Sequence, residues 1–255
     1  MCLIFISLNQ HPSYKLLVAG NRDEFYDRPT QPAAYWKDYA QVLGGRDLEA
    51  GGTWLGVTSA GRISMLTNYR DPKSIDPAAP TRGRLVADYL EGSSDAEAYL
   101  YALNGSGIRY NGFNLFAGTG DELYYYSNYQ GVVQRLEPGF FGISNKFLET
   151  PWPKVVKGKQ KIGPAFSRAI VDPEEVFSLL YDDVTAPTDQ LPDTGLSPAR
   201  ERALSSLFIK TENYGTRCST IVAVDRDDNW LFSERTYDPS DFSYTDQTYR
   251  FSLQS

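Results

Sequence analysis

A cysteine at the second position is the residue of this 255-residue chain best suited to chemistry. If Met1 is removed, Cys2 carries a free α-amine on its own backbone. An α-amine has a pKa of about 7.7–8.0 and a thiol one of about 8.5, so the amine can take the thiol proton near neutral pH. The alternative is that Cys2 is a small apolar residue on a buried strand, as free cysteines usually are. In a chain that keeps Met1, the nitrogen of Cys2 is a peptide nitrogen and cannot act as a base.

A charged quartet, Asn21-Arg22-Asp23-Glu24, follows the apolar segment 16–19 and is the second candidate group. If that segment pairs with the strand that holds Cys2, the quartet lies near one end of that strand. An arginine there can stabilise a thiolate or a substrate carboxylate, and a carboxylate can orient an amine. The alternative is a solvated turn with a local ion pair, which contributes little stability.

Three more polar clusters lie beside predicted strands: Asn68-Tyr69-Arg70, Ser144-Asn145-Lys146 and Thr216-Arg217-Cys218. The side-chain amide of an asparagine beside a nucleophile is a suitable donor to an oxyanion. Asparagine is also common in turns, which is the alternative for Asn68 and Asn145. The single histidine, His11, lies in a polar turn, so we expect neither a histidine-based triad nor a metal site.

Charge and composition exclude several classes of protein. The chain has 25 Lys and Arg against 32 Asp and Glu, a net charge of −7, which argues against a nucleic-acid partner and against attraction to anionic membranes. No apolar run reaches the roughly 18 residues of a membrane span, so no transmembrane segment is expected. Two cysteines cannot build a disulfide framework, so a reducing, cytoplasmic environment is expected.

The elements that must position these residues are marked by apolar patterns. Segments 2–6, 16–19 and 221–224 are apolar on both faces, which is typical of strands covered on both sides. Turn residues predict four hairpins, which join 2–6 with 16–19, 53–58 with 62–67, 113–117 with 123–127, and 219–224 with 230–234.

Helix signals fall into two blocks instead of alternating with strands, which argues against a doubly wound fold. Helices are expected over 83–90, at a capping box Ser94-Asp95-Ala96-Glu97, after Asp172-Pro173, and after Ser197-Pro198 with Ala203, Leu204, Leu207 and Phe208 turned inward. We therefore expect an α+β fold of two stacked, mainly antiparallel sheets flanked by helices, in a single domain over residues 1–255.

Five segments, taken together and in order, resemble the NRDE family, also described as transport and Golgi organisation protein 2-like. They are Met1-Cys2-Leu3, Asn21-Arg22-Asp23-Glu24, Gly51-Gly52-Thr53-Trp54-Leu55-Gly56, Thr67-Asn68-Tyr69-Arg70 and Thr150-Pro151-Trp152-Pro153-Lys154. The resemblance spans nearly the whole chain. The family is grouped with the N-terminal nucleophile hydrolases, which implies a four-layer αββα sandwich.

The order of the motifs is most similar, within that superfamily, to the cysteine amidases that cleave bile salts and penicillin V. The resemblance implies Cys2 as nucleophile, with its freed α-amine as base. It implies a flanking arginine and carboxylate from Arg22, Asp23 or Glu24, and leaves open which carboxylate acts. Asn68 and Asn145 resemble the oxyanion and amine-orienting asparagines, and Arg217 resembles the late arginine.

The expected function is hydrolysis of a linear C–N amide bond of a small molecule, without a cofactor. Its substrate-binding residues would be Asn21, Trp54, Tyr69 and Arg70. The alternative is a non-catalytic carrier of haem or an acyl lipid in the same pocket, since the eukaryotic relatives are linked to haem trafficking and lipid metabolism. With a single histidine, a cysteine, tyrosine or methionine would have to ligate the haem iron.

Overall fold

The computed structural model describes residues 2–253, and their strands form two antiparallel sheets. The six-stranded sheet A has the order β10-β1-β2-β11-β12-β13 and the seven-stranded sheet B has the order β3-β4-β5-β6-β7-β8-β9. Sheet A contains β1 (Cys2–Leu8), β2 (Tyr14–Phe25), β10 (Gly139–Ile143), β11 (Tyr214–Asp225), β12 (Asn229–Tyr237) and β13 (Tyr244–Ser252). Sheet B contains β3 (Thr30–Tyr35), β4 (Val42–Asp47), β5 (Leu55–Thr58), β6 (Arg62–Asn68), β7 (Phe113–Thr119), β8 (Leu123–Ser127) and β9 (Val132–Arg135).

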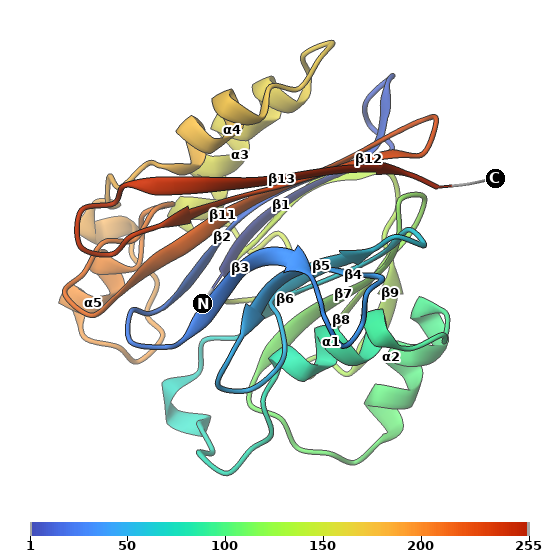
Figure 1. Cartoon of the computed structure of the whole chain (residues 1–255). Coiled ribbons are helices and arrows are strands. Elements are labelled where there is room, and N and C mark those ends of the chain that lie inside the picture. The colour runs from blue at the N-terminus through green and yellow to red at the C-terminus, as the bar shows by residue number, and fades with distance from the viewer. Residues whose placement is uncertain (1, 254–255) are drawn as a thin grey trace.

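Helices cover the outer face of each sheet, as Figure 1 shows. Sheet A is covered by α3 and α4, and sheet B by α1 and α2. A shorter helix, α5, precedes β11. The helices are α1 (Gly83–Glu91), α2 (Ala96–Gly105), α3 (Pro153–Phe166), α4 (Pro173–Leu180) and α5 (Pro198–Ala203). The expected αββα sandwich of two antiparallel sheets flanked by helices is therefore confirmed.

The alternation of side chains along β1 explains why its residues are apolar on both faces. All seven residues of this strand are buried. Ile4 and Ile6 face sheet B in the core between the two sheets, whereas Leu3 and Phe5 pack under α3 and α4. Successive residues of a strand point to opposite faces, so a central strand of a four-layer fold must be apolar on both.

The four predicted hairpins are confirmed by the pairing of β1 with β2, β5 with β6, β7 with β8, and β11 with β12. The capping box predicted to begin at Ser94 was wrong by one residue: the N-cap is Asp95, whose side chain accepts a hydrogen bond from the Ala98 backbone at 2.7 Å. The helix expected to carry Leu204, Leu207 and Phe208 was too long, because α5 ends at Ala203. The chain leaves the helix there, and the backbone N–H of Phe208 donates to the carbonyl of Asp182.

The longest helix, α3, was not predicted, and neither were the edge strands β9, β10, β13 and β3. The start of α3 lies in a proline-rich segment, 150–153, which is typical of a loop when read alone. Strand β13 alternates exposed residues with half-buried ones and has no continuous apolar run. Within residues 2–253, no helix has the length and apolar character needed to cross a membrane.

Gly158 allows α3 to lie against β1, and its replacement is a test of this packing. A Cβ at this position would come within 2.0 Å of the ring of Phe5, which is fully buried. We expect Gly158→Ala to lower the free energy of unfolding by about 1–3 kcal/mol through overpacking, measured by urea denaturation. The control is Gly163→Ala on the same helix, where the nearest atom lies 3.3 Å away. Equal stabilities of the two variants would contradict this account of the packing.

Candidate functional site

A pocket opens between the two sheets at the end where β1 begins, and a row of polar side chains crosses its floor on sheet A. Cys2 pairs with Arg22 on β2, and Arg22 pairs in turn with Cys218 on β11. Cys218 pairs with Thr236 on β12. All four line a cavity of about 1080 Å³. Paired residues of neighbouring strands project from the same face, so the register of the sheet alone brings these four together.

The thiol of Cys2 is almost completely buried, with 5% of the residue exposed. Burial raises its pKa to about 11, and the carboxylates of Asp23 and Glu24 also raise it, whereas the Arg22 guanidinium lowers it. Burial therefore outweighs the arginine, and the thiol of the Met1-bearing chain is protonated at neutral pH. Cys218 is also a free, buried cysteine.

The quartet 21–24 divides between the two faces of β2. Arg22 lies on the pocket face, where it donates to the hydroxyl of Thr30 at 3.1 Å. Glu24 lines the same pocket. Burial favours the neutral form of Glu24, but Arg22, Arg28 and a hydrogen bond from the Phe25 backbone hold its pKa below the ordinary value.

Asn21, which was predicted to bind substrate, is not part of the pocket wall. Its fully buried amide donates to the carbonyls of Leu180 and Leu207 at 3.1 and 2.9 Å, and its oxygen accepts from the hydroxyl of Ser219 at 2.6 Å. It pairs with Leu3, whose side chain packs under α3 and α4. Asn21 therefore faces the outer layer and ties the segments around α4 and α5 to sheet A.

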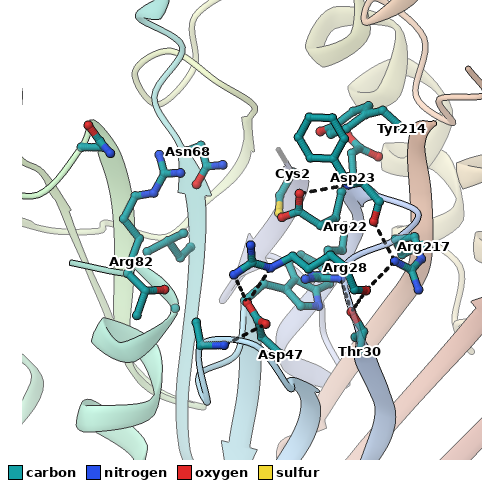
Figure 2. A pocket seen from close by; sticks show the side chains of 18 of the residues that line it. Cys2, Arg22, Asp23, Arg28, Thr30, Asp47, Asn68, Arg82, Tyr214 and Arg217 are labelled. Atoms are coloured by element: carbon teal, nitrogen blue, oxygen red, sulfur yellow. Dashed lines mark hydrogen bonds and ion pairs between the residues drawn. The ribbon is translucent and has the colours of Figure 1, made fainter. Parts of the chain in front are cut away.

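Asp23 reaches the pocket at the end of the strand. It is 1% exposed and accepts a hydrogen bond from the hydroxyl of Thr216 at 2.7 Å. Burial raises its pKa, while the charge of Lys154 and the bond from Thr216 act in the opposite direction. A break in the β2–β11 register between Thr216 and Cys218 lies beside it. Figure 2 shows Asp23 close to Cys2. Of the two carboxylates, Asp23 is the one held rigidly beside the nucleophile.

Asn68 and Asn145 lie at the same end as Cys2 but play different parts. Asn68 lines the pocket from sheet B. Asn145 is fully buried and is not part of the pocket wall: its amide donates to the Asn68 carbonyl at 2.9 Å, and its oxygen accepts from the Ser144 hydroxyl at 3.0 Å. The hydroxyl of Ser144 also donates to the Cys2 carbonyl at 3.4 Å. Asn145 therefore supports the backbone of Asn68 on β6, while its neighbour Ser144 bonds to Cys2 on β1. The catalytic role of Asn145 stays a prediction.

Arg217 lines the pocket next to Arg22, and its guanidinium donates to two backbone carbonyls. These belong to Phe25, the last residue of β2, and to Arg28 in the turn that follows, at 2.8 and 3.0 Å (Figure 2). Arg217 thus lines the same pocket as Cys2, and it also holds this segment in place. Its role toward a substrate stays a prediction.

The three remaining predicted substrate residues all line the pocket. Trp54 is 6% exposed, and its indole nitrogen has no hydrogen-bond partner among residues 2–253. Tyr69 stacks on Tyr129 with ring centroids 4.1 Å apart. Arg70 forms a buried ion pair with Glu201 at 2.6 Å, so its charge is already neutralised by the protein. Trp54 and Tyr69 are better placed for ligand contact than Arg70.

Two residues of the site were missed. Arg82, the residue before α1, lines the pocket and donates to the Gly112 carbonyl at 3.0 Å; Figure 2 shows it beside Asn68, across from Cys2. The position of Arg82 depends on the close approach of the backbone at Gly83 to Gly52, because a Cβ on Gly52 would lie 2.3 Å from the carbonyl carbon of Gly83.

The second residue that was missed is Lys154, the second residue of α3, which is 1% exposed and near Cys2 and Asp23. The sequence pointed to Lys154 only in that this residue belongs to segment 150–154, one of the five that carry the family resemblance.

Some of the arginines that line the pocket form ion pairs with carboxylates, and others do not. Arg28 is paired with Asp47 at 2.7 Å, and Arg70 with Glu201. In the described part of the chain, the guanidiniums of Arg22, Arg82 and Arg217 bond to a hydroxyl or to backbone carbonyls and form no ion pair. Guanidiniums without a carboxylate partner are suited to binding carboxylate, sulfonate or phosphate groups.

Comparison with known proteins yields relatives along the full length. The family described as Transport and Golgi organisation 2 matches residues 1–239. The Transport and Golgi organization 2 homologs of Mus musculus and Homo sapiens are 36% and 37% identical, each match covering 100% of both chains. The Drosophila melanogaster protein is 33% identical over 92% of each chain.

Solved structures with a similar arrangement share little sequence with the chain. One is a Caenorhabditis elegans ortholog of N-acylethanolamine-hydrolyzing acid amidase, with a TM-score of 0.49 and 12% identity over 86% of this chain and 92% of that one. Another is the C2A mutant of the conjugated bile acid hydrolase of Clostridium perfringens, with a TM-score of 0.40 and 9% identity over 98% and 84%. The family match over residues 1–239 and the relatives that are more than 30% identical together show that the chain belongs to the Transport and Golgi organisation 2 family.

Proposed function

We propose that the protein is a cysteine amidohydrolase that cleaves a linear C–N amide bond of a small anionic molecule, with Cys2 as the N-terminal nucleophile once Met1 is removed. The observation that carries this proposal is the convergence on Cys2 of a buried carboxylate, Asp23, and of polar groups from both sheets at one pocket. The two free cysteines favour the cytoplasm as its place of action.

The proposed reaction uses groups already in place. The neutral α-amine of Cys2 takes the thiol proton, and the sulfur attacks the carbonyl carbon of the amide. The side-chain amide of Asn68 donates to the oxygen that becomes negative. The α-ammonium then gives its proton to the leaving nitrogen as the C–N bond breaks, which leaves a thioester. Water, deprotonated by the same amine, cleaves the thioester into a carboxylic acid and the free thiol.

The substrate class follows from the unpaired charges of the pocket. Three guanidiniums, of Arg22, Arg82 and Arg217, surround a cavity whose wall also includes Trp54 and Leu66. Apolar walls with a few convergent polar groups are typical of small-molecule sites. An amide that joins an apolar acyl group to an acidic amine fits this combination.

The test is a panel of N-acyl amides with acidic, neutral and basic amine parts, given to the processed protein. We expect release of the amine from acidic members and less than about one-thousandth of that rate in Cys2→Ala, because the nucleophile is lost. Cys218→Ala is the matched control, a second buried pocket cysteine that the proposed reaction does not use. Hydrolysis that persists in Cys2→Ala, or that fails for every amide, would contradict the proposal.

The alternative, a non-catalytic carrier of haem or an acyl lipid, has one observation in its favour. With its pKa raised to about 11, the buried thiol of the Met1-bearing chain is a poor nucleophile. The fit to haem is partial: the unpaired guanidiniums suit its carboxylates, but the candidate iron ligands Cys2 and Cys218 are held protonated by burial. Ligand binding that survives in Cys2→Ala, without any hydrolysis, would support the carrier.

A further inference from the structure

A lysine near Cys2, Lys154, is buried although no ion pair or hydrogen bond within residues 2–253 accounts for its burial. Lys154 is 1% exposed, and its ammonium nitrogen has no hydrogen-bond partner among residues 2–253. A buried charge without a partner costs several kcal/mol, so such groups are rare and most often serve a function. Arg70, another buried cation in this region, forms an ion pair with Glu201.

The position of Lys154 in its helix is also unfavourable. It is the second residue of α3, and a cation in the first turn of a helix is repelled by the helix dipole. Side chains in a helix lean toward its N-terminus. The start of α3 follows shortly after β10, which pairs with β1. The side chain is therefore directed toward the end of sheet A where Cys2 lies.

Asp23 is the charged group that acts most strongly on Lys154, and Lys154 is the charged group that acts most strongly on Asp23. Within residues 2–253, the other groups that act on this carboxyl are the Thr216 hydroxyl and Tyr214 on β11, Cys2 on β1, Arg70 after β6, and Tyr26 after β2. Among the side chains outside its own strand, Lys154 is thus the principal counter-charge of Asp23.

We propose that Lys154 is a positioning residue that keeps the side chain of Asp23 in its charged form, so that the carboxylate can hold the freed α-ammonium of Cys2. This inference rests on the proposed function, because it assigns Asp23 to the amine of the nucleophile. A neutral carboxyl group loses the charge-assisted hydrogen bond that would orient the amine. Burying the ammonium of Lys154 without a hydrogen-bond partner destabilises the fold, but the charge of that ammonium keeps the buried carboxylate of Asp23 ionised.

The arrangement predicts a limited pH window. Burial raises the pKa of Asp23, and the charge of Lys154 works against that rise. Burial lowers the pKa of Lys154 to about 8, although Asp23 raises it. Asp23 therefore loses its charge on the acid side, and Lys154 loses its charge above about pH 8.

The test follows the carboxyl carbon of Asp23 by ¹³C NMR in aspartate-labelled full-length protein, assigned with Asp23→Asn. We expect its titration midpoint to rise by about one pH unit or more in Lys154→Met, and in the same direction in Lys154→Gln. Lys154→Arg, which keeps the charge, should restore a midpoint close to that of the parent. Lys157→Met is the matched control, because the Lys157 ammonium on the same helix is paired with Asp182 at 2.8 Å.

An Asp23 midpoint that is unchanged in folded Lys154→Met or Lys154→Gln would overturn the inference. A shift that Lys154→Arg fails to restore would also overturn it, since packing instead of charge would be the cause. The measurement needs no turnover, so it is separable from the amidase assay. An upward shift without hydrolysis of any amide supports the role of Lys154 and contradicts only the proposed reaction.

Discussion

Amide hydrolysis, and rapid alkylation of Cys2 near pH 7, are expected only in the chain that has lost Met1. In the Met1-bearing chain the pKa of the Cys2 thiol is about 11, raised mainly by burial. About one thiol in ten thousand is then ionised at pH 7. The backbone nitrogen of Cys2 is then an amide and cannot act as a base. The single histidine, His11, follows the opposite end of β1, where its ring hydrogen-bonds to the carbonyl of Arg168. Removal of Met1 adds an amine that can take the proton and, as an ammonium, favours the thiolate.

At pH 7 we expect iodoacetamide to modify Cys2 at least about tenfold faster in the processed protein than in the Met1-bearing form. That ratio corresponds to a pKa of the thiol that is lower by one unit or more. The rate of the Met1-bearing form should rise steadily with pH toward about 11, because its thiol is protonated below that value. Intact mass and peptide mapping identify the modified residue, and Cys2→Ala is the blank.

The second cysteine is an internal reference for this experiment. Burial raises the pKa of Cys218 well above its ordinary value, so it should react slowly in both forms. Equal rates at Cys2 in the two forms would remove the basis of the hydrolase mechanism. The carrier would then be the better account of the pocket.

Loss of the buried ion pair between Arg70 and Glu201 is expected to have the largest effect on stability. The two side chains are 5% and 3% exposed and their charged atoms are 2.6 Å apart. Glu201→Ala leaves the Arg70 guanidinium buried without a counter-charge and should lower the free energy of unfolding by about 3–5 kcal/mol. Urea denaturation measures the change.

The matched control is Glu175→Ala, which removes an ion pair with Arg168 whose side chains are 30% and 60% exposed. Exposed pairs contribute about 0–1 kcal/mol, so this variant should stay close to the parent. The double variant Arg70→Met/Glu201→Leu should recover much of the lost stability, because no unpaired charge is left. A small effect of Glu201→Ala alone would mean that water reaches Arg70.

The ion pair also has a consequence for the site. The Arg70 backbone N–H donates to the Asn145 carbonyl at 2.7 Å, and the Asn145 amide supports the carbonyl of Asn68. Destabilising Arg70 therefore loosens the segment that presents Asn68 to the pocket.

The sequence by itself determined the layers and the hairpins of this protein. Strands such as β1 and β2 are apolar on both faces, and only a position between two other layers accommodates that pattern. Pairing β1 with β2 by a short turn then places the quartet 21–24 at the end of the strand where Cys2 begins. The approximate location of the site followed from these local signals.

The direction of each side chain was decided by the tertiary structure. Neighbouring residues of a strand point to opposite faces, so Arg22 enters the pocket while Asn21 binds the carbonyls of Leu180 and Leu207. Asn145 resembled a catalytic asparagine in sequence order, yet its amide donates to the carbonyl of Asn68, and it accepts a hydrogen bond from Ser144. Nothing in a single sequence tells which of two polar neighbours faces the pocket.

Arg82 and Lys154 needed the folded chain for a different reason. Each is separated from Cys2 by dozens of residues and reaches the site only through the packing of a helix. The start of α1 approaches Gly52, between β4 and β5, at Gly83, and α3 approaches Phe5 on β1 at Gly158. Burial and the absence of a hydrogen-bond partner are properties of the three-dimensional surroundings. They turn Lys154, a surface residue by type, into a buried ammonium next to Asp23 that has no hydrogen-bond partner within residues 2–253.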